Sequence, residues 1–87
     1  MSISRNTIVV LNATLECNKA GVFPTIGEVA KLTGLSYYKV QKELRLACSM
    51  KWVIDLERPH RPNVNKRVWL VAKSIRETVK EWYNAQF

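Results

Sequence analysis

Residues 25–51 constrain the fold more than any other stretch, because they carry the end signals of two short helices around a tight turn. Thr25 and Glu28 have the spacing of a capping box, in which a hydroxyl and a carboxylate each bond a free backbone amide at a helix start. Gly34 stands where a left-handed residue ends that helix at low cost. Ser36 is a ready N-cap for a second helix.

Both predicted helices carry apolar side chains about one turn apart, which predicts a buried stripe along each of them. In the first helix these side chains are Ile26, Val29, Ala30 and Leu32. In the second helix they are Val40, Leu44 and Ala47 or Cys48. Leu35 adds an apolar side chain in the turn. The stretch therefore has a helix-turn-helix pattern.

The 87 residues suffice for one small domain, and a hydrophobic fraction of 47% favours a compact globule over a disordered chain. No apolar run approaches the ~20 residues that a membrane span needs, and residues 1–20 lack a signal-peptide layout. Cys17 and Cys48 have no second pair near either of them. We therefore expect free thiols in a cytoplasmic protein that does not contact a membrane.

The net charge of +7 is concentrated in two segments. Residues 36–51 hold four basic side chains and one acidic side chain, and residues 58–67 hold four basic side chains and no acid. Basic and acidic side chains balance over the rest of the chain. This segregation predicts a polyanionic partner.

Residues 4–20 are predicted to form a helix with Ser4 or Asn6 as its cap and Gly21 after its end. Apolar side chains cover more of this helix than one small core requires. Either the helix is central to the globule, or its outer face pairs with a second copy of the chain.

Residues 52–57 and 67–71 are rich in β-branched and aromatic side chains and predict two strands of a hairpin. The segment between them, residues 58–66, contains two prolines and two asparagines and predicts a loop.

A last helix is predicted over residues 74–87, opened by a second capping box of Ser74 and Glu77. Near its end, Trp82, Tyr83 and Phe87 add apolar surface to that of the first helix. An open apolar patch of this size is unusual in a monomer. We therefore expect a homodimer that pairs through helices 4–20 and 74–87.

Residues 25–71 resemble the winged helix-turn-helix DNA-binding domain of prokaryotic and phage transcription regulators. The resemblance lies in the run EVAKLTGLS, followed by KV, and in the later segments WVIDL and RVWLV. It implies a mainly α fold with a small β-hairpin, in the order helix, helix, helix, strand, wing, strand, helix, within one domain of residues 1–87. Lys51 departs from it, since many members carry glycine there, and Glu43 departs where members are often apolar. That turn is expected to pack through Leu44 and Leu46 instead.

The second helix of the pattern, residues 36–50, is the predicted recognition helix. Lys39 follows Ser36 where a capping box would place an acid, so the helix start is left free for a phosphate oxygen. Long amide and cationic side chains can bond adenine or guanine edges in the major groove. The predicted contacts are Ser36, Tyr37, Tyr38, Lys39, Gln41, Lys42 and Arg45. The sequence does not separate base readers from phosphate contacts.

The wing is predicted to hold the DNA backbone or the minor groove, where positive side chains are favoured. Its predicted contacts are Arg58, His60, Arg61, Asn63, Asn65, Lys66 and Arg67. One histidine, no paired aspartates and no glycine-rich phosphate loop leave no candidate catalytic, metal or cofactor site. No small-molecule ligand is evident either, and we reject an enzymatic function.

These features favour a regulator of transcription that binds double-stranded DNA, repressor-like by resemblance. An alternative is an adaptor whose basic face docks an acidic protein, because winged helices also serve in protein interactions. A third is binding of RNA or left-handed DNA through the same face. Trp69 after a proline-containing wing resembles the family that binds left-handed DNA, but the asparagine and tyrosine that this family carries on its third helix are here Gln41 and Arg45.

Overall fold

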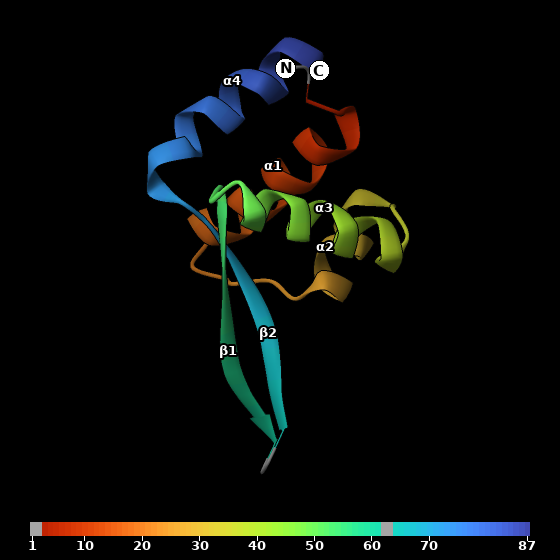
Figure 1. Cartoon of the computed structure of the whole chain (residues 1–87), viewed down its shortest axis with the longest axis vertical. Helices are drawn as coiled ribbons and strands as arrows, with labels where there is room; N and C mark the ends of the chain where they lie inside the picture. Colours follow the sequence, from red (N-terminus) through yellow and green to blue (C-terminus); the bar gives the residue numbers. More distant parts are fainter. Residues whose placement is uncertain (1–2, 62–63) are drawn as a thin grey trace.

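The computed structural model describes residues 3–61 and 64–87, and over residues 59–61 and 64–65 it describes the backbone alone. The elements are α1 (Arg5–Lys19), α2 (Ile26–Thr33), α3 (Tyr37–Ser49), β1 (Val53–Arg61), β2 (Val64–Val71), a 3-10 turn η1 (Lys73–Ile75) and α4 (Arg76–Gln86). The helices form a body from which the β1–β2 hairpin projects, and the molecule measures 43 × 26 × 24 Å (Figure 1). This is the order expected of a winged helix. No helix in the described part of the chain is long and apolar enough to cross a membrane.

The predicted caps open the first three helices. The Thr25 hydroxyl accepts a bond from the Glu28 amide at 3.2 Å, and the Glu28 carboxylate accepts one from the Thr25 amide at 3.2 Å. The Ser36 hydroxyl accepts a bond from the Lys39 amide at 3.2 Å. Ser4 caps α1 in the same way. Each bond satisfies a backbone donor that has no partner inside its helix.

Helices α1 and α3 end in the same way. In each case two backbone N–H groups beyond the helix donate to carbonyls of its last turn, over 2.8–3.0 Å. The residue that turns the chain is Gly21 after α1, with φ 81°, and Lys51 after α3, with φ 62°. Lys51 alone among the described residues other than glycine has a positive φ. It therefore occupies a glycine-type position, as the resemblance implied.

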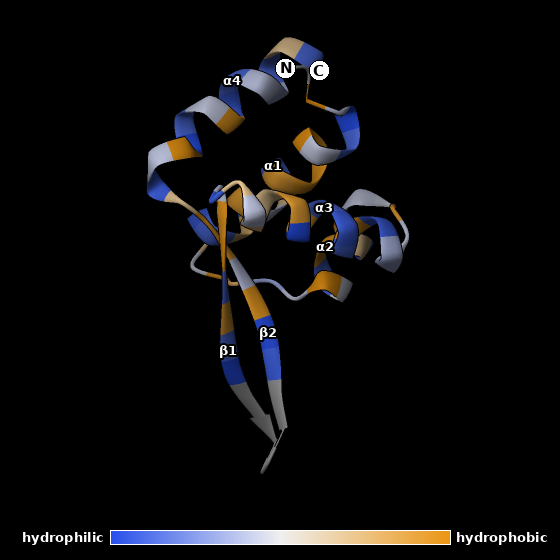
Figure 2. Ribbon diagram, viewed as in Figure 1, coloured by the Kyte–Doolittle hydropathy of each residue, from blue (hydrophilic) through white to orange (hydrophobic). Residues whose placement is uncertain are grey.

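Helix α1 is the centre of the body, in contact with α2, α3, α4 and β2. The hydrophobic residues of the helices lie mainly where the helices face one another (Figure 2). The largest fully buried side chains include Leu11 and Leu15 of α1, Val29 of α2 and Leu44 of α3. The apolar circumference of α1 is thus mostly accounted for by its central place in the core.

Two leucines expected to pack inside lie at the surface. Leu32 is 64% exposed and Leu46 is 50% exposed. The third helix instead meets α1 through a polar contact, in which the Thr7 hydroxyl donates to the Glu43 carboxylate at 2.5 Å. Of the two leucines expected to pack that turn, Leu44 is fully buried as predicted, and the prediction for Leu46 was wrong.

The hairpin is longer than the sequence predicted. The segment expected to be a loop continues both strands, and Pro59 pairs with Asn65 in the antiparallel register. Proline lacks the amide that a central strand needs, but each strand of a two-stranded hairpin has an outer edge with no strand beyond it. The prediction of a loop was therefore wrong over residues 58–61 and 64–66, and residues 62–63 of that prediction lie outside the described residues.

Asn18 of α1 fixes the base of the hairpin. Its Oδ1 accepts a bond from the Val71 amide at 2.8 Å, and its Nδ2 donates to the Trp69 carbonyl at 3.2 Å. The Trp69 amide donates to the Pro24 carbonyl at 3.0 Å. The outer edge of β2 is therefore covered where it meets the body, a role that the sequence analysis did not assign to Asn18.

Helix α4 does not begin with the predicted capping box. Ser74 lies inside η1, and α4 begins at Arg76 without a side-chain bond at its N-cap. A capping serine must stand just outside its helix, and the 3-10 turn moves that boundary to Ile75.

The aromatic side chains at the end of α4 separate rather than cluster. Trp82 meets Trp52 edge to face, with ring centroids 5.3 Å apart, and packs against the core. Tyr83 stacks on Phe87 at 4.7 Å. Only part of the predicted aromatic surface is therefore open.

Lys80 pairs with Glu16 of α1, and this hydrogen bond lowers the pKa of the Glu16 carboxyl.

Candidate nucleic-acid interface

An open groove of about 650 Å³ lies between α3 and the hairpin. Its α3 wall is formed by Tyr37, Gln41, Arg45 and Ser49. Its hairpin wall is formed by Asp55, Arg67 and Trp69. The groove brings together predicted contacts from the recognition helix and from the wing.

Most predicted contacts of α3 are exposed to solvent. Tyr38 is 71% exposed, and Lys39, Lys42 and Arg45 are exposed as well. Gln41 is half-buried on the wall of the groove, one turn before Arg45. These two long side chains therefore line the space beside the hairpin, whereas the two lysines are not part of its lining.

Two exposed cations face each other on the hairpin. Arg58 and Lys66 are partners in the register of β1 and β2. Like charges directly opposite on neighbouring strands repel each other, and a bound anion would relieve the repulsion. The structure describes only the backbone of the predicted contacts His60, Arg61 and Asn65. The predicted contact Asn63 lies outside the described residues.

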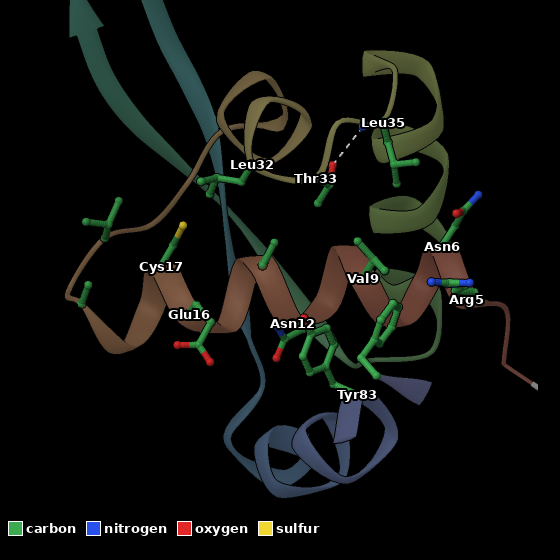
Figure 3. A pocket seen from close by; sticks show the side chains of 14 residues that line it. Arg5, Asn6, Val9, Asn12, Glu16, Cys17, Leu32, Thr33, Leu35 and Tyr83 are labelled. Carbon is green, nitrogen blue, oxygen red and sulfur yellow. Dashed lines mark hydrogen bonds between the residues drawn. The ribbon is translucent and has the colours of Figure 1, made fainter. Parts of the chain in front are cut away.

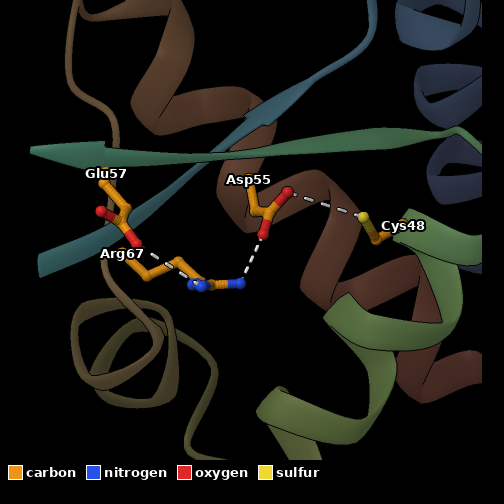
Figure 4. Close-up of polar contacts among 4 residues, drawn as sticks. All are labelled: Cys48, Asp55, Glu57 and Arg67. Atoms are coloured by element: carbon orange, nitrogen blue, oxygen red, sulfur yellow. Dashed lines mark hydrogen bonds and ion pairs between the residues drawn. The ribbon is translucent and has the colours of Figure 1, made fainter.

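Arg67 lies in a polar network rather than alone on the wing (Figure 4). Its Nη1 is 2.5 Å from Oδ2 of Asp55, and its Nη2 is 3.8 Å from Oε1 of Glu57. The Cys48 thiol of α3 donates to Oδ1 of Asp55 at 4.0 Å. The charge of Arg67 is therefore balanced within the hairpin, which a count along the sequence cannot reveal.

Trp69, the residue that favoured left-handed DNA or RNA, is only 3% exposed. Its indole N–H has no hydrogen-bond partner among the described residues. The ring packs in the core, at the floor of the groove, and presents almost no surface to a ligand.

A second groove, of about 780 Å³, lies among α1, the end of α2 and the end of α4 (Figure 3). Its apolar lining includes Val9, Cys17, Leu32, Leu35 and Phe87. Burial raises the pKa of the Cys17 thiol, which therefore stays neutral in this apolar surrounding. This apolar groove shares no residue with the groove beside α3.

No protein-family model matches the sequence, and no curated protein matches it either. Two solved structures share its fold. One is a zinc-responsive MarR family member, ZitR of Lactococcus lactis, with a TM-score of 0.74 and 13% identity. The other is a possible transcriptional regulator from Methanosarcina mazei, with a TM-score of 0.69 and 8% identity.

The match covers 97% of this chain in both cases, but 54% of the Lactococcus protein and 72% of the Methanosarcina protein. The chain therefore spans about half the length of the first. Within the described residues, no three His, Cys, Asp or Glu side chains form a group that could hold a metal ion. The comparisons confirm the winged helix-turn-helix fold.

Proposed function

We propose that this chain binds double-stranded DNA and regulates transcription as a repressor-like factor. Helix α3 lies in the major groove, and the hairpin holds the backbone or the minor groove. The observation that carries the proposal is the groove beside α3, which Gln41 and Arg45 of that helix line together with the hairpin. The major groove of B-DNA admits one α-helix, and side chains of this type bond base edges there.

The charge of the molecule supports this proposal. A net charge of +7 on 87 residues attracts a polyanion, and α3 and the hairpin each expose cations to solvent. One of the two similar structures is named a possible transcriptional regulator, which favours a role in transcription over another use of the fold.

We further propose that two copies of the chain pair through the apolar groove of α1, α2 and α4. One recognition helix makes few contacts, and specific binding must compete with a genome of other sites. A two-fold dimer places two such helices on two half-sites about one turn of DNA apart. The groove is apolar and leaves the surface of α3 free.

The proposal is tested by fluorescence-polarisation titrations with duplex DNA, duplex RNA and single strands at several salt concentrations. Each phosphate that a side chain neutralises contributes about −0.9 to the slope of log K against log salt on duplex DNA. We expect a steep slope from several contacts and the tightest binding on duplex DNA. A flat slope, or tighter binding to single strands, would contradict DNA binding.

The adaptor alternative is favoured by one observation. The outer surface of α3 exposes Tyr38, Leu46 and Met50, which are apolar enough to contact a protein. An adaptor that docks an acidic protein would show the flat salt dependence on duplex DNA described above. The same titration therefore separates the two functions.

A further inference from the structure

The charge of the hairpin is divided along its length. Near the body, the Arg67 guanidinium lies between the carboxylates of Asp55 and Glu57 (Figure 4). Further out, Arg58 and Lys66 face each other without a carboxylate in their own register pair. The last cation of the basic segment 58–67 therefore lies beside two carboxylates of β1, which form an acidic section of the hairpin.

This acidic section lies on the wall of the proposed DNA groove. Asp55 and Arg67 line that groove together with Gln41 and Arg45. A carboxylate there repels phosphate, and a paired arginine has to break its ion pair before it can neutralise a phosphate. Both effects lower the affinity for any DNA backbone, whatever its base sequence.

Asp55 has the larger part in this arrangement. It lies 2.5 Å from Arg67, whereas Glu57 lies 3.8 Å from it. The Asp55 side chain is 37% exposed, and its second oxygen accepts the Cys48 thiol bond from α3. The hairpin thus holds Asp55 through the short Arg67 contact, and the recognition helix adds only a long thiol contact.

We propose that Asp55 is a specificity-determining residue, which restrains Arg67 and so weakens binding to DNA of arbitrary sequence. The inference rests on the proposed function. Asp55 lowers the part of the affinity that comes from contacts with the DNA backbone. The total affinity therefore depends more on the base contacts of α3. In the free protein Arg67 is therefore paired with Asp55 and is not an unpaired cation ready to bind a phosphate.

The test is Asp55→Asn, which keeps the size of the side chain and removes its charge. We expect the affinity for random duplex DNA to rise about threefold or more at low salt, and the salt slope to steepen by about 0.9, one phosphate contact. The ratio between a duplex selected from a random pool and a random duplex should fall. Circular dichroism melts check that the variant is folded.

Two controls make the result specific. Glu81→Gln makes the same change in net charge at an exposed residue of α4 and should leave the slope unchanged. In an Arg67→Gln background, Asp55→Asn should still remove the repulsion between carboxylate and phosphate, but it should steepen the slope less, because no cation is left to release. Equal steepening with and without Arg67 would overturn the inference. Weaker binding of Asp55→Asn would also overturn it, because Asp55 would then orient Arg67 toward DNA. A wild-type protein that does not bind duplex DNA would refute the proposed function itself.

Discussion

Lys51 and Gly21 hold the same left-handed backbone conformation at the ends of two helices. At this φ a side chain costs about 1–2 kcal/mol through steric crowding. Glycine avoids that cost, but it loses more conformational entropy on folding, and this loss offsets part of the difference. The position after α3 therefore carries strain that the position after α1 avoids. Lys51 is also one of the cations of the basic segment 36–51.

We predict that Lys51→Gly raises the free energy of unfolding by about 0.5–1 kcal/mol, whereas Gly21→Ala lowers it by about 1 kcal/mol. A Cβ at Gly21 would meet no atom within 4 Å, so its effect comes from the backbone alone. Urea denaturation followed by circular dichroism measures both changes. A loss of stability in Lys51→Gly would show that the lysine side chain makes a compensating contact.

The helix-turn-helix was predictable because its signals are local. The residues that carry them cap a helix or turn the backbone within a few positions of themselves, namely Thr25, Glu28, Gly34 and Ser36. All four take the predicted roles. The length of the hairpin was not predictable, since Pro59 is a strand breaker in a wide sheet and tolerable in a two-stranded one. Part of the candidate site, the groove wall of Gln41 and Arg45, followed from helical spacing.

The ion pair of Arg67 could not have been predicted from the sequence. It depends on the register of β1 against β2, which places Arg67 opposite Glu57 and diagonal to Asp55. A prediction that shortened both strands had no basis for this register. The net charge counted along a segment of the sequence therefore overstated the charge that remains unpaired in the folded protein.

Helix α3 and the hairpin should contribute differently to DNA binding. We predict that Gln41→Ala or Arg45→Ala costs about 1–3 kcal/mol on a selected duplex and relaxes its specificity, because these side chains reach base edges. Lys66→Ala should weaken selected and random duplexes about equally, because it meets phosphates. Titrations of each variant on both duplexes measure this. Equal losses on both for Gln41 and Arg45 would show that α3 does not read sequence.

For the assembly, we predict that the protein is a dimer at high micromolar concentration and that Leu32→Asp makes it a monomer with weaker DNA binding. Leu32 is 64% exposed in the apolar groove, so the charge should leave the fold intact. Trp82 is less suitable as a probe, because it packs on Trp52.

Sedimentation equilibrium measures the mass, and Ile54→Asp is the matched control, since Ile54 is an exposed apolar residue of the hairpin outside the groove. That variant should remain a dimer. A single species of 10.1 kDa for the unmodified protein would exclude the dimer.

The hairpin is also a long arm that projects from the body and is held at its base by Asn18. Nine residues of β1 extend about 30 Å at ~3.3 Å per residue. A tilt of about 10° at the base would move the tip by about 5 Å, more than the ~3.4 Å that separates neighbouring base pairs. If the chain binds DNA as proposed, the two bonds from Asn18 to β2, both close to the body, would determine which base-pair step the outer part of the hairpin reaches.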